Sequence, residues 1–220
     1  MELNEIGKKK FLAKGFMAKC YLLEDGNVLK IFNCQRSIDE MEMFKHFLKY
    51  DNDSFVFPFE FIYDSEKFYG YITKFVLGNT LEVEFPKSNL LNLSTNSIRL
   101  EKDIDFVSDG GIVLYDLHDQ NVLYDGKKYS VIDHDENGIK EDISTVRRTN
   151  RQMHRILIGN LFIENLRKLE RTKLITDKIQ IYKFMKMPPS EMIVQIKSDM
   201  DKYYKEDVST IEELKDIIRR

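Results

Sequence analysis

The chain has 220 residues, 42% of them hydrophobic, which is enough for one large domain or two small lobes that share a cleft. Its 34 basic and 37 acidic residues give a formal net charge of −3, which argues against a bulk basic surface for nucleic acid. No apolar run approaches the ~20 residues that span a bilayer, and the first residues lack an apolar signal core. The isolated Cys20 and Cys34 fit a reducing compartment. We therefore expect a cytoplasmic protein without membrane or nucleic-acid partners.

The first third of the chain alternates short apolar runs with turn residues, a pattern typical of an antiparallel sheet. Strands are predicted at residues 10–12, 19–23, 28–32, 57–63 and 68–76. Between the third and fourth strands, apolar residues recur at helical spacing over residues 38–50, and Ser37 is a suitable N-cap. The predicted order is three strands, one helix and two strands.

The rest of the chain predicts mainly helices. A short helix is expected at residues 97–108, followed by a strand from Gly111 and a hairpin that ends near Asp133. From Thr149 onward an apolar stripe at helical spacing indicates a long helix, and Pro188-Pro189 begins another. Ser209 and Glu212 have the spacing of a capping box for the last helix. Strands followed by helices predict an α+β fold.

The most informative segment is the run Asp116-Leu117-His118-Asp119-Gln120-Asn121, which follows an apolar strand. Asp133 comes twelve residues after Asn121, at the end of the second strand of the predicted hairpin. Phosphoryl transfer needs a carboxylate near the acceptor hydroxyl, and an amide plus a second carboxylate to hold magnesium. The order and spacing of these side chains resemble the catalytic loop and metal-binding aspartate of the protein-kinase-like superfamily.

This resemblance covers about residues 11–136 and implies a kinase-like two-lobe fold. The five-stranded antiparallel small lobe with one helix would span residues 1–77, and the mainly helical large lobe residues 78–220. The resemblance also implies an enzyme that uses ATP and Mg²⁺ to transfer the γ-phosphoryl group to a hydroxyl group. In that reading Asp116 is catalytic and receives the acceptor's proton, whereas Asn121 and Asp133 bind the metal. The alternative, a polar loop followed by a turn carboxylate, is disfavoured by the flanking strands.

Lys30 stands inside an apolar strand, where a cation needs either a partner or an exit to solvent. The resemblance implies that Lys30 contacts the nucleotide phosphates and supports catalysis. Its expected partner is Glu40, because apolar residues follow Glu40 at helical spacing; Glu42 is the competing choice. Glu40 has a second possible role, since Ser37 and Glu40 also have the spacing of a capping box.

The other ATP-binding residues are implied by the resemblance alone. Gly15 stands where the superfamily has a phosphate-covering turn with several glycines, and Ala18 is small enough not to block a nucleotide. Residues 68–81 resemble the strand that becomes the interlobe hinge. Thr73 would then guard the back pocket, and the backbone of Lys74 and Val76 would bind the adenine edge.

The acceptor is left open between a protein and a small molecule. His118 gives the run a DLH form that resembles aminoglycoside, choline and related small-molecule kinases as well as atypical bacterial Ser/Thr kinases. His118 would bind the γ-phosphate or brace the loop. Tyr115 replaces the arginine that usually precedes the catalytic aspartate, so we expect no activation-loop phosphate switch. After Glu136 no motif of a peptide platform follows. A nucleotide-binding pseudokinase, and an enzyme that transfers AMP or another group, are the further alternatives.

Overall fold

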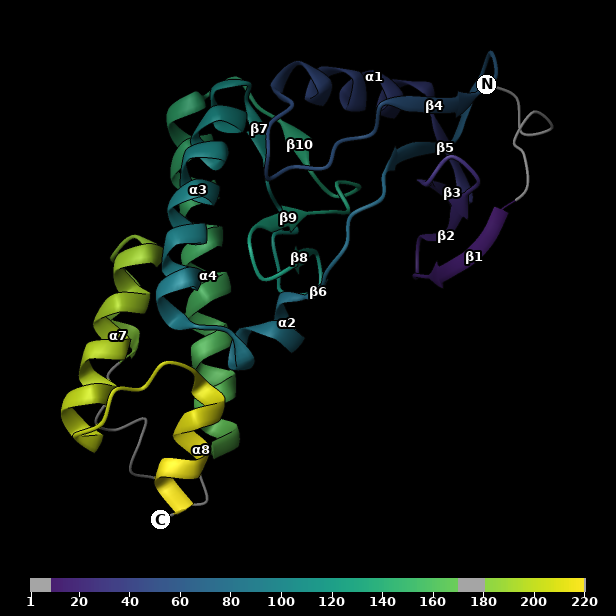
Figure 1. Ribbon diagram of the computed structural model, residues 1–220. Coiled ribbons are helices and arrows are strands. Elements are labelled where there is room, and N and C mark those ends of the chain that lie inside the picture. Colours follow the sequence, from purple (N-terminus) through teal and green to yellow (C-terminus); the bar gives the residue numbers. More distant parts are fainter. Residues whose placement is uncertain (1–8, 170–180, 220) are drawn as a thin grey trace. The chain divides into compact units, whose positions relative to one another are not determined.

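Contacts along the chain separate it into two units, Met1–Val76 and Leu77–Arg220. The computed structural model describes residues 9–169 and 181–219, which Figure 1 draws as ribbons and arrows. The first unit is built on a sheet and helix α1, and the second is mostly helical. The predicted α+β class and the predicted five-stranded antiparallel sheet are therefore confirmed.

The strand order in the sheet of the first unit is β1-β2-β3-β5-β4, and every neighbouring pair is antiparallel. The strands are β1 (Lys9–Lys14), β2 (Ala18–Leu23), β3 (Asn27–Ser37), β4 (Glu60–Tyr63) and β5 (Lys67–Lys74). Strand β4 is shorter than the predicted strand at residues 57–63, because Pro58 has no N–H to donate to a neighbouring strand.

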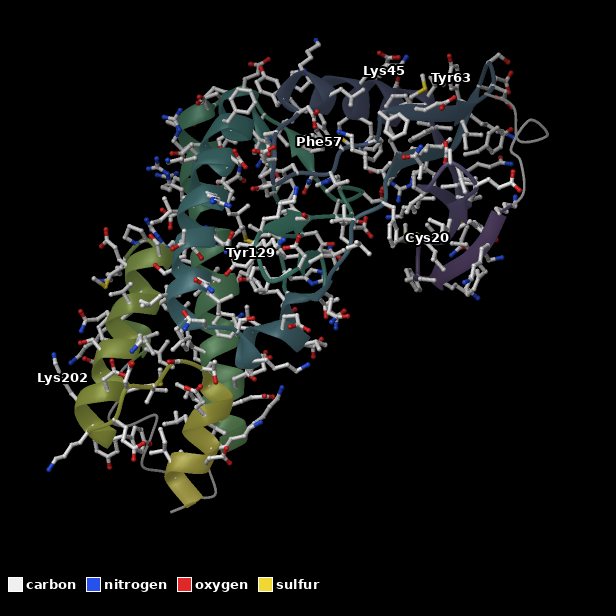
Figure 2. The ribbon with its side chains drawn as sticks, viewed as in Figure 1. Cys20, Lys45, Phe57, Tyr63, Tyr129 and Lys202 are labelled. Atoms are coloured by element: carbon white, nitrogen blue, oxygen red, sulfur yellow. The ribbon has the colours of Figure 1, made fainter. Side chains whose placement is uncertain are left out.

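Helix α1 (Ile38–Phe47) continues as a 3₁₀ turn (Leu48–Tyr50) and packs on the sheet through aromatic rings. Phe44 is fully buried, and its ring centroid lies 5.3 Å from that of Tyr71. At the end of the helix, Phe47 lies 5.6 Å from Phe57. Figure 2 labels Lys45 of α1 and Tyr63 of β4, whose ammonium and ring centroid are 5.8 Å apart. Burial of such rings is the main force that holds an amphipathic helix on a sheet.

The register of the sheet decides which side chains share the face that α1 covers. Cys20, Lys30 and Tyr71 stand opposite one another on β2, β3 and β5. Because Tyr71 packs against Phe44, this is the face toward α1. The opposite face carries a separate apolar cluster, formed by Leu29, Ile62 and Ile72. Lys30 therefore lies on the α1 side of the sheet.

The second unit is organised around three helices: α3 (Leu90–Asp109), α4 (Ile143–Leu169) and α7 (Pro189–Tyr204). Figure 1 shows them side by side, and α3 contacts both of the others. The remaining helical segments are α2 (Leu81–Glu84), a 3₁₀ turn (Phe85–Lys87), α6 (Ile181–Phe184) and α8 (Ile211–Arg219). Within residues 9–169 and 181–219, no helix combines the length and the apolar content needed to cross a membrane.

Two small sheets attach the central loops to these helices. Strands β6 (Asn79–Thr80), β8 (Val122–Tyr124) and β9 (Tyr129–Val131) form one, and β7 (Ile112–Val113) pairs with β10 (Gly138–Ile139) in the other. Tyr129, labelled in Figure 2, is buried, and its hydroxyl donates to the carbonyl of Leu93 on α3 at 3.2 Å. The β8–β9 hairpin is thus fixed to α3, and it positions the segment between Leu114 and Asp133.

Helix α3 begins at Leu90, whereas the sequence pattern predicts a start at residue 97. The side chain of Asn89 accepts from the N–H groups of Leu91 and Asn92, so the preceding polar stretch contains the N-cap. Leu90 and Leu93 are fully buried. The first turns of α3, which the sequence pattern did not predict, are therefore stabilised by an N-cap and by core contacts. The polar composition of this stretch gave no indication of either.

Two further helix starts differ from the prediction. Helix α4 begins at Ile143, before Thr149, because Asp142 accepts from the Ser144 hydroxyl at 2.7 Å and from the Thr145 N–H at 3.1 Å. These hydrogen bonds, of which that from Ser144 is the strongest, lower the pKa of Asp142 to about 2.

The capping box of α8 is displaced by one residue from the predicted pair, Ser209 and Glu212. Thr210 Oγ1 accepts from the N–H of Glu213 at 3.1 Å. In return, Glu213 Oε2 accepts from the N–H groups of Ser209 and Thr210. The predicted pair was therefore wrong by one position, although the helix itself is present.

Candidate active site

The loop after β7 is a tight turn held by its own backbone. The N–H of His118 donates to the carbonyl of Asp116, and the N–H of Asn121 donates to the carbonyl of His118, each at 3.1 Å. Leu117 is only 3% exposed, so the apolar residue of the run anchors the turn in the core. The polar side chains of the run therefore stand on a backbone fixed from both sides.

The structure joins the two ends of this run. Asn121 Nδ2 donates to Asp116 Oδ2 at 2.8 Å and to the backbone carbonyl of Asp116 at 3.2 Å. A carboxylate can only accept, so the amide nitrogen of Asn121 faces Asp116, and its amide oxygen is left for another ligand. The side chain of Asp116 is 38% exposed, which allows a hydroxyl group to approach the carboxylate. Asp116 is thus held in place and still accessible.

Asp133 is brought to the same end of the β8–β9 hairpin as Asn121. The N–H of Ile132 donates to the carbonyl of Asn121 at 2.8 Å, which extends the hairpin register by one pair. The next residue, Asp133, is exposed and has φ = 60°, a left-handed conformation that aspartate tolerates better than most residues. The chain turns there, and the N–H of Asp135 lies 3.4 Å from Asp133 Oδ1. Asn121 and Asp133 are therefore neighbours across the hairpin end.

A buried pair of polar residues supports the turn after Asp133, and the sequence pattern did not single it out. His134 is 1% exposed, and Asn137 Nδ2 lies 3.2 Å from its Nδ1. The N–H of Asn137 also donates to the carbonyl of His134 at 3.2 Å. At the adjacent Gly138, a Cβ would come within 3.2 Å of the Tyr115 ring. A larger residue there would press on the residue that precedes Asp116.

His118 braces Asp116 in the structure. Its Nε2 lies 3.4 Å from Asp116 Oδ1, and its Nδ1 accepts from the N–H of Gln120 at 3.2 Å. Because Nδ1 is an acceptor, the ring proton belongs on Nε2, where it points to the carboxylate. Bracing is one of the two roles predicted for His118. The other, contact with a γ-phosphate, stays a prediction.

The donor set fits Mg²⁺ only together with a ligand that supplies further oxygens. Among the residues that the structure describes, no three His, Cys, Asp or Glu side chains are grouped closely enough to hold a metal ion. Asn121 offers an amide oxygen and Asp133 a carboxylate, and Mg²⁺ commonly binds one or two such protein oxygens plus phosphate and water. These residues therefore suit a magnesium ion that arrives with nucleotide phosphates rather than one caged by the protein.

Asn150 of α4 holds the strand that leads to Asp116, and sequence reasoning missed it. Its Oδ1 accepts from the N–H of Leu114 at 2.8 Å, and its Nδ2 donates to the carbonyl of Ile112 at 2.8 Å and to Ser108 Oγ at 2.9 Å. Asn150 is fully buried, so these bonds form away from water. In the sequence, Asn150 is only a single asparagine near the start of the apolar stripe of a predicted helix, which does not indicate a structural role. Its partners lie 36 to 42 residues away, too far for a local pattern.

In the first unit, the register places three of the predicted ATP-binding residues on one sheet face. Lys30 is 7% exposed, and its ammonium lies 5.7 Å from the Tyr71 ring centroid. Ala18 stands opposite Phe32, and Thr73 opposite Val28, so both lie on the face of Lys30. The hydroxyl of Thr73 donates toward the carbonyls of Val56 and Phe57, at 3.2 and 3.3 Å. Lys30, Ala18 and Thr73 thus share the face toward α1.

Glu40 is engaged at the start of its own helix. Its Oε2 lies 3.1 Å from Arg36 Nη1, and its Oε1 accepts from the N–H of Ser37 at 3.4 Å, which completes a capping box. The competing residue, Glu42, lies 2.7 Å from Lys45 Nζ. The capping alternative for Glu40 is therefore realised. Its pairing with Lys30 stays a prediction.

The remaining predicted ATP-binding residues, Gly15, Lys74 and Val76, are expected to act mainly through their backbone atoms. Gly15 donates its N–H to the carbonyl of Ala18 at 2.8 Å, and a Cβ at position 15 would meet only that oxygen, at 3.8 Å. The turn at Gly15 therefore does not require glycine on steric grounds. Lys74 ends β5 and is exposed, and Val76 is the last residue of the first unit. Their predicted hydrogen bonds to adenine involve main-chain atoms, so side-chain surroundings do not decide them.

The kinase resemblance implies that Lys30 contacts nucleotide phosphates, so Lys30→Met should reduce phosphoryl transfer at least about tenfold and leave the sheet folded. Methionine keeps an unbranched apolar stem for the buried position but removes the ammonium. Transfer rate and thermal melting should be measured on the same preparation. Lys9→Met is the matched control, because Lys9 also lies over a tyrosine ring, that of Tyr21, but is exposed. Equal rates for Lys30→Met and the wild type would remove Lys30 from the mechanism.

A comparison of the chain with protein-family models gives no match, and a comparison with curated proteins gives no significant match either.

Proposed function

We propose that the chain is an Mg²⁺- and ATP-dependent phosphotransferase, similar to an atypical, minimal Ser/Thr protein kinase, that transfers the γ-phosphoryl group to a hydroxyl acceptor. The observation that carries the proposal is the hydrogen-bonded pair Asp116–Asn121, with Asp133 at the same hairpin end. A proton acceptor and two oxygen ligands for magnesium are thereby held on one rigid segment. This is the set of groups that phosphoryl transfer requires.

The proposal extends to a kinase-like two-lobe fold, in which each unit contributes its own groups. The first unit would contribute the ammonium of Lys30, and the backbone of Lys74 and Val76 to adenine. The second would contribute the segment from Asp116 to Asp133. Support comes from the element order of the first unit, which is three strands, a helix and two strands, followed by a mostly helical unit. A buried lysine on the α1 face of the sheet is the second support.

In this mechanism Asp116 orients the acceptor hydroxyl and takes up its proton as the acceptor oxygen bonds to the γ-phosphorus. The bond from that phosphorus to the bridging oxygen breaks, and ADP leaves. Asn121 and His118 restrict the carboxylate to one orientation, which reduces the entropy cost of positioning. The amide oxygen of Asn121 and the carboxylate of Asp133 would hold a magnesium ion. That ion would neutralise charge on the transferring phosphoryl group. Lys30 would add a positive charge near the phosphates.

A small-molecule kinase of the aminoglycoside or choline kinase type is the second candidate, and one observation favours it. After Asp133 the chain forms only the two-residue strand β10 before α4 begins at Ile143. That leaves residues 134–142 for the region that carries the peptide platform in the resembled protein kinases. A short connection of this kind leaves room for a small hydroxyl acceptor and provides little surface for a peptide.

A nucleotide-binding pseudokinase that acts as an interaction module is the third candidate. It needs a nucleotide site but has no chemical need for an oriented proton acceptor. The Asp116 carboxylate accepts a hydrogen bond from Asn121 Nδ2 at 2.8 Å and is still partly exposed. A carboxylate that is oriented and accessible in this way suits a proton acceptor, which nucleotide binding alone does not need. This observation ranks the enzyme above the pseudokinase.

Mg-ATP should raise the melting temperature of the protein, and EDTA should remove most of the rise. A ligand at about 100 times its Kd stabilises a fold by about 2.7 kcal/mol, which corresponds to about 5 °C or more for a chain of this size. The magnesium dependence follows from the donor set, since Asn121 and Asp133 can hold phosphates only through a cation. An equal shift with and without magnesium would contradict the metal roles of these two residues.

A further inference from the structure

The hairpin formed by β1 and β2 carries a local positive charge that the chain as a whole does not. Residues 9–23 contain four lysines, at positions 9, 10, 14 and 19, and no acidic residue, whereas the net charge of the chain is −3. All six residues of β1 are exposed, and so is Lys19 on β2. Charges act over about 8–10 Å at physiological ionic strength, so the hairpin presents a cationic surface despite the negative total.

The same hairpin exposes large apolar side chains. Phe16, in the turn between the two strands, is 94% exposed, the largest fraction among the large apolar side chains that the structure describes. Its neighbour Met17 is exposed too, as are Phe11 and Leu12 on β1. A single exposed apolar residue is ordinary, but a group of them among polar residues marks an interaction surface.

Several backbone groups of this turn are hydrogen-bonded within the protein. The N–H of Gly15 donates to the carbonyl of Ala18 at 2.8 Å. Asn33 of β3 donates twice to the turn, from Nδ2 to the carbonyl of Phe16 at 2.7 Å and from its N–H to the carbonyl of Met17 at 2.8 Å. A carbonyl that already has a protein partner loses little when it leaves water. The two most exposed apolar residues of the turn therefore stand on a fixed backbone that can enter an apolar phase at low cost.

The register of the sheet places three of the lysines and two aromatic rings on one face. Lys14 stands opposite Lys19, and Phe11 opposite Tyr21, with their ring centroids 5.9 Å apart. Lys9 precedes Phe11 by two residues and lies on the same side of β1. This is the face away from α1, because Tyr21 packs on the apolar cluster of that face. Cations and exposed apolar side chains thus alternate over one side of the hairpin and its turn.

We propose that the β1–β2 hairpin docks on an anionic membrane surface, with Phe16 and Met17 inserted among the lipids and the lysines paired with headgroup phosphate and carboxylate groups. Lysine suits this place, since its stem lies along apolar surface while its ammonium stays in the polar layer. The apolar side chains stand on a turn rather than in a groove. A bilayer yields around such a turn, whereas a folded protein would need a matching pocket. Leu12 and Met17 offer no ring for a nucleic-acid base, but lipid accommodates both.

The proposal departs from the expectation of no membrane partner, which rested on the net charge and on the lack of a long apolar run. Binding at a membrane surface needs neither a spanning segment nor a basic chain, only a local cationic and apolar surface. It does not depend on the proposed function. There the turn at Gly15 would contact phosphates through backbone N–H groups, whereas a membrane would take the side chains of the turn.

The chain contains no tryptophan, so Phe16→Trp places a single indole fluorophore in the turn. The full chain is mixed with vesicles of phosphatidylcholine and phosphatidylserine at a ratio of about two to one, or of phosphatidylcholine alone. With the anionic vesicles, the emission should shift to the blue, and bromine on the acyl chains should quench it. Phe59→Trp is the matched control, because Phe59 is exposed beside β4, at the opposite edge of the sheet, and its emission should not change. No shift with anionic vesicles, or an equal response of both variants, would overturn the proposal.

Sedimentation of the full chain with the same vesicles separates insertion from charge. Phe16→Ser should weaken binding at least about tenfold without lowering the melting temperature, because the ring is exposed in the free protein. Lys14→Gln together with Lys19→Gln should weaken it about twentyfold, since each lysine near an anionic surface contributes about fivefold. Lys49→Gln together with Lys127→Gln removes the same charge from exposed positions elsewhere, and should change binding less than about twofold. Unchanged binding in both hairpin variants, or a preference of the wild type for polyglutamate or DNA over the vesicles, would contradict the membrane assignment.

Discussion

Asp116→Asn should abolish phosphoryl transfer, with a loss of about 10³-fold, while magnesium-dependent ATP binding persists. Asparagine keeps the shape of the side chain and retains an oxygen that can accept from Asn121, so the loop should keep its conformation. It cannot take up the proton of the acceptor. Transfer should be followed with labelled ATP, and binding by the rise in melting temperature with Mg-ATP.

Asp133→Asn should lose both transfer and the magnesium-dependent rise in melting temperature. The substitution removes a negative charge from the metal ligand, whereas Asp116→Asn changes only the proton acceptor. Asp119→Asn is the matched control for both, because Asp119 belongs to the same loop and lies 3.7 Å from His118 Nδ1 without an assigned chemical role. Loss of ATP binding in Asp116→Asn together with its retention in Asp133→Asn would show that the roles are reversed.

Asn150→Ala should lower the free energy of unfolding by about 3 kcal/mol or more and slow transfer. It leaves the N–H of Leu114 and the carbonyl of Ile112 buried without their shared partner, and each such group costs about 1–3 kcal/mol. Ser108 Oγ also loses a donor, although it still donates to the carbonyl of Ile104. Chemical denaturation of the two-unit chain should show the change in the transition that reports the helical unit.

Asn165→Ala provides the comparison on the same helix. Asn165 is also buried, but its side chain donates to the carbonyl of Leu161 within α4 itself. Its loss removes a local bond and should cost about 1 kcal/mol. If both variants lose the same stability, Asn150 does not brace the strand before Asp116 in the way its three hydrogen bonds indicate.

The sheet and α1 were predictable because their signals are local. Short apolar runs bounded by turn residues define the five strands, and Ser37 marks the start of α1 with its own side chain. The pair Asp116–Asn121 was predictable for the same reason, since both residues belong to one turn. Local spacing of side chains decides each of these features.

Features that depend on contacts between residues far apart in the chain could not be predicted from the sequence. The first turns of α3 are stabilised by the burial of Leu90 and Leu93, but these residues form no periodic apolar stripe that would predict a helix. From the sequence, Asn150 cannot be told from any other helical asparagine, because its role depends on contacts with β7 and Ser108. Glu40 had two local readings, and the hydrogen bonds to Arg36 and Ser37 realise the capping one. Burial and long-range hydrogen bonds, not composition, decide such positions.

The most direct test of the central claim is incubation of the purified chain with Mg²⁺ and γ-labelled ATP, alone and with candidate hydroxyl acceptors. The account predicts that the wild type moves the label from ATP to a hydroxyl group, on the protein or on a small molecule. It also predicts that the Asp116→Asn variant leaves the label in ATP. A wild-type chain that binds Mg-ATP but transfers no label to any acceptor would contradict the enzyme and favour the pseudokinase. Transfer that is equal in the wild type and in Asp116→Asn would contradict the assigned site.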